Sequence, residues 1–335
     1  MASLPFSSPF DADGPPSPRL WRGLAEGRQN SGRAEADGRR TAGGGYEYTQ
    51  VHMGLPVRLV LHAADERTAQ FAATAAFERI AALDRMMSDY RPDSEVRQIA
   101  RHAGEPVPVS RELFAVVRRA VEIASATGGA FDPTIGPLVT LWRDASRTSR
   151  LPALDALAVA RTQVGWRHIE LDAAHSTIRL GLPGMSLDLG GIAKGYILQE
   201  ALRTMRIHGV NRSLAESGGD IIVGDAPPGR PGWAIRTAGA GAAFAERASR
   251  LTNAALASSG ASAQFVEIDG VRYSHVIDPR TGVGVTSPRI ARVIAEDAAT
   301  ADALATAFTV LEPAAAGALL PQFPGAIVSL SAAES

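Results

Sequence analysis

The chain has 335 residues and a formal net charge of −1, from 34 basic and 35 acidic side chains. It contains no cysteine, which excludes disulfide frameworks, thiolate metal sites, iron–sulfur clusters and cysteine nucleophiles, so any catalysis must use oxygen and nitrogen groups. A near-neutral chain offers no basic field to a phosphate backbone, so nucleic acid is not an expected partner.

The first residues, 1–48, are rich in Pro, Gly, Ser and Arg and have only scattered large apolar side chains. Such a segment cannot bury enough apolar surface to offset the entropy lost on ordering it. We therefore expect a disordered leader over 1–48 and one folded unit over 49–335.

Helices and strands are then expected from periodicity and caps. The alternation of Val51, Val57, Leu59 and Leu61 predicts a strand. A helical pattern begins at Asp65 and places apolar side chains at positions 71, 77, 80, 83 and 87. Residue 110, a serine, can cap a second helix that ends at the glycine pair 128–129.

The rest of the chain alternates helices and strands irregularly. Short strands are expected at 169–171, 177–180 and 185–187, a helix at 192–207, and further strands at 212–215, 220–223, 233–236, 264–268, 272–277 and 290–295. This order favours an α+β fold of mixed, largely antiparallel sheets with packed helices. Residues 313–333 carry no charge, but prolines interrupt them, so we expect a short helix and a buried strand, not a membrane span.

The glycine-rich segment 128–134 allows two interpretations. In one, Asp132 caps a helix that starts at Pro133. In the other, the backbone forms an edge against a planar ligand, with Phe131 available for stacking.

The segment 187–196 runs from a strand through Gly190 and Gly191 into a helix. Free backbone N–H groups and a positive helix end at such a turn suit an anionic phosphate. The spacing matches neither the dinucleotide fingerprint nor the P-loop. The turn also holds Lys194, the single lysine of the chain, which suggests a need for a compact ammonium and not a planar guanidinium.

Two later segments carry further candidate groups. His275 lies on a predicted strand before an Asp-Pro-Arg-Thr-Gly turn, where a histidine is either structural or catalytic. Asp302 and Thr306 are four residues apart on a predicted helix and so project from one face. Carboxylate and hydroxyl oxygens suit a hard cation such as Mg²⁺, completed by backbone carbonyls, water and a substrate phosphate.

Together these segments, in this order, resemble the ApbE family, the FAD:protein FMN transferases formerly described as thiamine-biosynthesis lipoproteins. The resemblance covers about residues 50 to 330. It rests on Met53-Gly54, Tyr90-Arg91-Pro92-Asp93-Ser94-Glu95, the segments 129–138 and 188–196, Ser217-Gly218-Gly219-Asp220, the segment 274–282, and Asp302 to Thr306.

The resemblance implies an ApbE-like, T-fold-related single globular unit that transfers FMN from FAD to a threonine hydroxyl of a partner flavoprotein and releases AMP. It implies Mg²⁺ as cofactor and FAD as substrate. The flavin would contact Met53, Tyr90, Ala130, Phe131 and Asp132, while Asp188 and Lys194 would hold FAD and the segment around His275 and Ile277 would close the site. The metal would be bound by Asp302, Thr306 and the carbonyl of Gly191. His275 is the candidate proton acceptor, with Asp220 in reserve.

Two other functions remain open from the residues. Water could replace threonine at the same phosphate, which would make the protein an FAD pyrophosphatase, or the site could bind flavin without turnover. The acceptor motif Asp-Gly/Ala-x-Ser/Thr-Gly-Ala-Thr does not occur in this chain, so the acceptor is expected to be another protein. Arg39 and Arg40 are not followed by the apolar run of a signal peptide. We therefore expect a cytoplasmic protein, with the cell envelope or periplasm, as in many family members, as the alternative.

Overall fold

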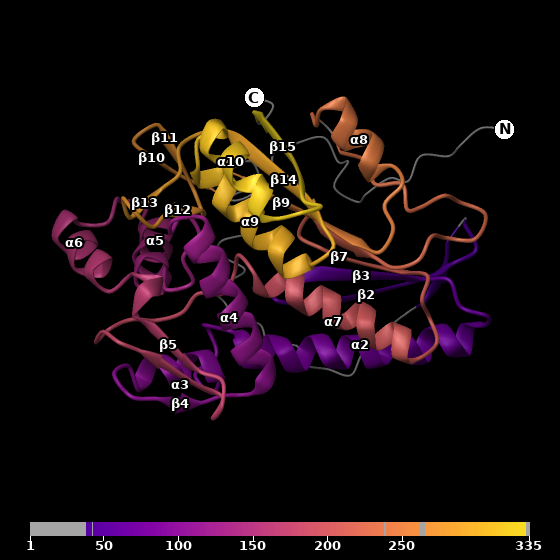
Figure 1. Ribbon diagram of the computed structural model, residues 1–335, viewed down its shortest axis with the longest axis horizontal. Coiled ribbons are helices and arrows are strands. Elements are labelled where there is room, and N and C mark those ends of the chain that lie inside the picture. The colour runs from indigo at the N-terminus through magenta and orange to yellow at the C-terminus, as the bar shows by residue number, and fades with distance from the viewer. Residues whose placement is uncertain (1–37, 42, 238, 261–264, 333–335) are drawn as a thin grey trace.

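One eight-stranded antiparallel sheet organises the computed structural model, which describes residues 38–41, 43–237, 239–260 and 265–332 (Figure 1). The strand order is β1-β2-β3-β7-β8-β9-β14-β15. The strands are β1 (Arg39–Arg40), β2 (Tyr46–His52), β3 (Leu55–Leu61), β7 (Ser213–Ser217), β8 (Asp220–Val223), β9 (Ala254–Gly260), β14 (Arg289–Ala295) and β15 (Ile327–Ala332).

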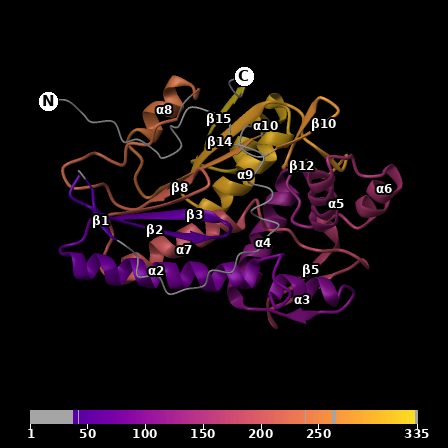
Figure 2. The same ribbon diagram turned by 180° about the vertical axis from the view of Figure 1, so that it is seen from behind.

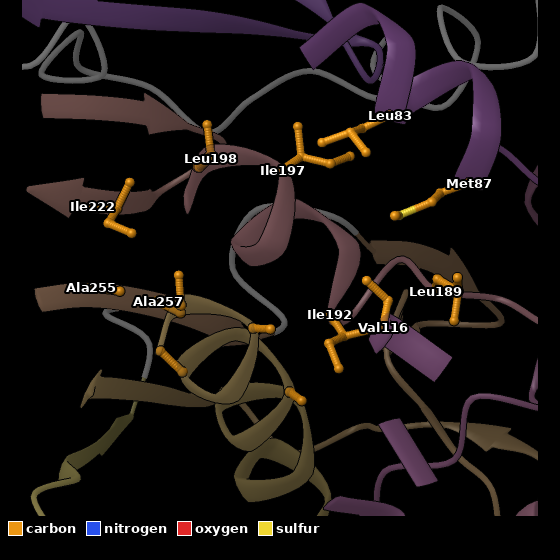
Figure 3. Close-up of a cluster of buried hydrophobic side chains, with 14 of the residues drawn as sticks. Leu83, Met87, Val116, Leu189, Ile192, Ile197, Leu198, Ile222, Ala255 and Ala257 are labelled. Carbon is orange, nitrogen blue, oxygen red and sulfur yellow. The ribbon is translucent and has the colours of Figure 1, made fainter. Parts of the chain in front are cut away.

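Three helices cover one face of this sheet. Helices α7 (Ala193–Ile207) and α9 (Ala298–Val310) pack directly on the strands, and α2 (Glu66–Met87) packs beside α7. Figures 1 and 2 show α2 and α7 side by side from both directions. Apolar side chains from α2, α7, β8 and β9 meet in the main core, as Figure 3 shows. The opposite face carries a smaller core under α8 (Ala242–Ala248).

Several of the remaining elements extend the molecule at one end (Figures 1 and 2). Here α5 (Gly136–Thr148) and α6 (Leu154–Thr162) lie beside the hairpin of β12 (Ile277–Asp278) and β13 (Val283–Gly284). Trp142 on α5 donates a hydrogen bond from Nε1 to the carbonyl of Gly282 at 2.8 Å. The helices are α3 (Glu95–Arg101), α4 (Arg111–Ala126), α5 (Gly136–Thr148), α6 (Leu154–Thr162), α10 (Pro313–Leu319), and the 3₁₀ turns η1 (Trp166–His168) and η2 (Leu320–Gln322). The strands are β4 (Val107–Pro108), β5 (Ile169–Asp172), β6 (Thr177–Leu180), β10 (Phe265–Ile268), β11 (Val271–Ser274), β12 (Ile277–Asp278) and β13 (Val283–Gly284).

The cap expected at Ser110 is confirmed, because Ser110 accepts a hydrogen bond from the Leu113 N–H at 3.2 Å at the start of α4. Asp65, where the helical pattern was expected to begin, is the N-cap of α2 and accepts a hydrogen bond from the Thr68 N–H at 2.8 Å. Each side-chain oxygen satisfies one of the free N–H groups of a helix N-terminus. The predicted α+β class with antiparallel pairing is likewise confirmed.

Several strand predictions were wrong. The alternating run 51–61 is a hairpin, because Met53 and Gly54 adopt positive φ and turn the chain. Residues 185–187 and 233–236 form only single bridges, at Ser186 and Trp233. The run 272–277 is broken at residues 275–276 into β11 and β12. Position 264, the predicted start of a strand, lies outside the described residues.

Strand β9 was missed altogether. Its sequence is Ala-Ala-Leu-Ala-Ser-Ser-Gly, which lacks the branched and aromatic side chains that favour strands. Ala255 and Ala257 lie in the main core with the alanine-rich helix α9, which packs directly on β9. Close helix–sheet packing, which depends on tertiary contacts, therefore overrides local propensity here.

The ends of the described chain also differ from expectation. Residues 46–48, assigned to the leader, belong to β2, where Tyr46 and Tyr48 are buried. Residues 1–37 of the predicted leader lie outside the described residues. The predicted buried strand near the C-terminus is the edge strand β15, which is only partly buried. Among the described residues, none of the helices is both long and apolar enough to cross a bilayer.

Candidate active site

The start of α7 approaches α9 so closely that only a glycine fits at position 195. A Cβ on Gly195 would lie 2.1 Å from the carbonyl oxygen of Ala298. The N–H of Gly195 donates a hydrogen bond to Oδ2 of Asp302 at 3.1 Å. This close crossing brings Lys194 beside an aspartate that is 108 positions away in the sequence.

Lys194 lies between two buried carboxylates. Its ammonium forms an ion pair with Oδ2 of Asp220, and its Nζ lies 3.6 Å from Oδ1 of Asp302. The second oxygen of Asp220 accepts a hydrogen bond from the N–H of Ser258 on β9 at 3.0 Å. We refer to Lys194, Asp220 and Asp302 as the lysine cluster.

The charges of the lysine cluster perturb one another. Burial alone would lower the pKa of Lys194, but the two aspartates outweigh it and raise the pKa above its ordinary value, so the lysine is protonated. Burial raises the pKa of Asp302 to about 7, with Lys194 opposing this shift and the charge of Asp220 adding to it. One ammonium thus faces two carboxylates, which leaves the cluster short of positive charge.

Thr306 and Gly191 complete a set of oxygen groups beside Asp302. A Cβ on Gly191 would lie 2.9 Å from Oγ1 of Thr306, so the glycine turn passes directly against this hydroxyl. No group of three or more His, Asp or Glu side chains that could hold a metal occurs in the described ranges. One carboxylate, one hydroxyl and one carbonyl form an incomplete donor set for Mg²⁺, which fits an ion whose other ligands are water and substrate phosphate.

A second cation–carboxylate group contacts the glycine turn at Gly190. Arg143 on α5 forms ion pairs with Asp89 and Asp188, the latter at 3.3 Å. Its guanidinium also lies over the ring of Tyr90, 4.2 Å from the centroid. Asp188 accepts a hydrogen bond from the Gly190 N–H at 2.9 Å. We refer to Arg143, Asp89 and Asp188 as the arginine cluster.

Two of the predicted flavin contacts, Met53 and Tyr90, come from segments that flank α2. Met53 lies in the β2–β3 turn, where its N–H donates to Oδ2 of Asp84 at 3.0 Å. Tyr90 follows the end of α2 and is 53% exposed. Both positions can be reached by a ligand.

The segment 130–132 is buried. Phe131 is 3% exposed and packs in the main core, so the stacking expected of it is not available in this structure. Asp132 does not cap α5, which begins at Gly136; its oxygens accept from the N–H and hydroxyl of Thr134, at 2.9 and 2.6 Å, and from the N–H of Trp166 at 3.0 Å. These contacts tie the loop together, and the pKa of Asp132 is raised by burial.

His275 and Ile277 differ in exposure. His275 is exposed between β11 and β12, whereas Ile277 is buried against α5 with Leu138 and Trp142. The contacts described above bring together Lys194, Asp220, Asp302, Thr306 and Gly191.

A family model described as the ApbE family matches residues 53–329. The chain belongs to the ApbE family. An FAD:protein FMN transferase from Treponema pallidum is 36% identical over 258 residues, which are 72% of this chain and 71% of the relative. One from Vibrio cholerae is 32% identical over 255 residues, 74% of this chain and 75% of the relative.

Solved ApbE structures share the fold. The ApbE protein from Thermotoga maritima has a TM-score of 0.75 at 29% identity, covering 87% of this chain and 97% of that one. The Pseudomonas stutzeri flavinyl transferase ApbE has a TM-score of 0.74 at 25% identity, covering 87% and 92%. The fold of this ApbE chain is therefore that of the family.

Sequence reasoning missed two members of the arginine cluster, Arg143 and Asp89, whereas it named Asp188 as a residue that would hold FAD. Asp89 and Arg143 are 54 positions apart, and Arg143 and Asp188 are 45 apart. No local periodicity or cap connects them. The one available signal was that Asp89 directly precedes Tyr90, a residue of an ApbE motif.

Proposed function

We propose that this chain transfers FMN from FAD to a threonine hydroxyl of a partner protein and releases AMP. The relatives named FAD:protein FMN transferase support this reaction. The observation that carries the proposal is the lysine cluster, placed against a glycine turn and Thr306. Such an arrangement suits a pyrophosphate, on which negative charge builds as one P–O bond forms and another breaks.

In this reaction the acceptor hydroxyl oxygen forms a bond to the phosphorus of the FMN moiety. The bond from that phosphorus to the bridging oxygen breaks, and AMP leaves with the bridging oxygen. The proton of the hydroxyl passes to a base. No redox change is required.

Asp302, Thr306 and the carbonyl of Gly191 would hold Mg²⁺. When bound there, the ion would neutralise charge developing on the pyrophosphate oxygens. Lys194 would add a second positive charge from the start of α7. Its two aspartates fix where the ammonium lies, so the lysine serves the site by position and charge.

We infer that His275 is the proton acceptor, with Asp220 in reserve. Both carboxylate oxygens of Asp220 already accept hydrogen bonds, one from Lys194 and one from Ser258. His275 is exposed, and the ordinary pKa of histidine lies near neutrality.

The acceptor is proposed to carry threonine in an Asp-Gly/Ala-x-Ser/Thr-Gly-Ala-Thr motif. The cytoplasmic location expected from the sequence stays a prediction.

The test is incubation of the purified protein with FAD and Mg²⁺, with and without a peptide carrying the motif. The proposal predicts AMP release that depends on the peptide, and an FMN-sized mass increase on its threonine. AMP release that ignores the peptide would indicate an FAD pyrophosphatase. FAD binding without AMP release in either arm would indicate a flavin-binding module.

A further inference from the structure

Arg143 contacts groups from two other segments of the chain. Its two terminal nitrogens donate to different carboxylates, Nη1 to Asp89 at the end of α2 and Nη2 to Asp188 before the glycine turn. The flat face of the same guanidinium lies over the ring of Tyr90. A planar cation with donors on its edge and a π face can make all these contacts at once, which an ammonium cannot.

These contacts restrict two side chains. Tyr90 is about half exposed and follows the last turn of α2, and the guanidinium of Arg143 covers its ring. Asp188 bonds on one side to Arg143 and on the other to the Gly190 N–H. Arg143 therefore connects the Tyr90 segment to the glycine turn.

The charges agree with this arrangement. Burial raises the pKa of Asp188 and the charge of Asp89 raises it further, whereas Arg143 lowers it. Without Arg143 the two carboxylates would face each other uncompensated.

We propose that Arg143 is a positioning residue for FAD, which holds Tyr90 and Asp188 in the arrangement that binds the flavin end of the substrate. This inference rests on the proposed function, because that function makes FAD the ligand of these two side chains. Arg143 acts through its neighbours and takes no part in the bond changes.

The test is the FAD affinity of Arg143→Met, measured by flavin fluorescence without Mg²⁺ and without acceptor. Methionine keeps the length and apolar stem but loses the charge and the fork. We expect the Kd for FAD to rise about tenfold. In the transfer assay the KM for FAD should rise similarly, while kcat at saturating FAD changes less than about threefold.

Arg147→Met is the matched control. Arg147 lies one turn further along α5 and pairs with Asp144 on the surface. Its loss should leave the Kd for FAD unchanged. An unchanged Kd in Arg143→Met, in a protein that unfolds cooperatively like wild type, overturns the inference.

A double-mutant cycle separates positioning from general stability. If Arg143 acts through Tyr90, then Arg143→Met combined with Tyr90→Leu weakens FAD binding by less than the product of the two single effects. If the two substitutions together raise the Kd for FAD by the full product of their single effects, Arg143 does not act by positioning Tyr90. Asp89→Asn offers a milder variant should Arg143→Met fail to fold; it should weaken FAD binding in the same direction, and unchanged affinity there counts against the inference.

The binding assay also distinguishes this inference from the proposed function. If Arg143→Met loses FAD affinity and wild type never modifies an acceptor, the positioning role stands but the transferase function is rejected. Wild-type affinity in Arg143→Met, with normal transfer by wild type, would reject the positioning role alone.

Discussion

The lysine and arginine clusters have the same number of charged groups but differ in burial and in the type of cation. Each places one cation between two carboxylates, and in the sequence the Gly190–Gly191 turn lies between Asp188 of one cluster and Lys194 of the other. The carboxylates of the lysine cluster are 4% and 7% exposed, against 23% and 14% in the arginine cluster. The buried cluster uses a compact ammonium, and the shallower one uses a planar guanidinium stacked on an aromatic ring.

This difference indicates two tasks. Deep carboxylates that lack full compensation, next to a hydroxyl and a carbonyl, suit a hard cation and the phosphates it would bind. A guanidinium that fastens an exposed tyrosine suits the orientation of a flat ring system. The two glycines of the turn lie against different groups. A Cβ on Gly190 would lie 3.0 Å from Asp188 of the arginine cluster, and a Cβ on Gly191 would lie 2.9 Å from Thr306, which neighbours Asp302 on α9.

The largest effect is expected from Asp302→Asn. The amide removes the charge that would hold the metal while keeping the shape of the side chain. FMN transfer should fall more than about a hundredfold. Asp297→Asn, at the N-cap of the same helix, is the control and should retain activity. A near-wild-type rate in Asp302→Asn would move the metal site elsewhere.

The second largest loss of activity is expected from Lys194→Arg. A planar fork cannot occupy the place of a point ammonium between Asp220 and Asp302, so kcat/KM for FAD should fall about tenfold to a hundredfold. Steady-state kinetics, with the exposed Arg203→Lys on the same helix for comparison, would measure this. Full activity would show that the single lysine of the chain is incidental.

The two glycines of the turn can be compared directly. In Gly191→Ala the methyl group displaces Thr306, so the Mg²⁺ concentration for half-maximal transfer should rise about tenfold. In Gly190→Ala the methyl group presses on Asp188, so the Kd for FAD should rise instead. Identical effects of both substitutions would mean that the turn does not separate two functions.

The smallest effect is a pH-dependent change in stability. The pKa of Asp188 is raised, so the folded chain takes up this proton at a higher pH than the unfolded chain, and the contribution of the group to stability rises as the pH falls. Protonation also removes the charge that Arg143 compensates. Arg143→Met should therefore destabilise by about 1 kcal/mol at about pH 8 and by less at about pH 5. Urea unfolding at both values checks this, and equal destabilisation at both would contradict it.

Local rules predicted the elements with caps and clear periodicity, such as α2 and α4, and the Asp302–Thr306 face of α9. These rules failed where tertiary packing determines the local structure or the burial of a side chain. Strand β9 exists because α9 packs on its small side chains, and Phe131 is buried because its ring fills space beside Gly191.

The candidate site shows the same limit. Lys194 and Asp302 were each predicted to contribute, but their contact depends on the close crossing at Gly195. Arg143 escaped prediction because its partners come from distant segments. Motifs therefore identified most of the groups, whereas the contacts between them required the fold.

The most direct test of the central claim is mass spectrometry of an acceptor peptide after incubation with this protein, FAD and Mg²⁺. The account predicts an FMN-sized adduct on the threonine of the motif, formed by wild type and by Asp297→Asn but not by Asp302→Asn. An unmodified peptide, with a wild type that binds FAD, would contradict the claim that the lysine cluster and its metal site transfer FMN.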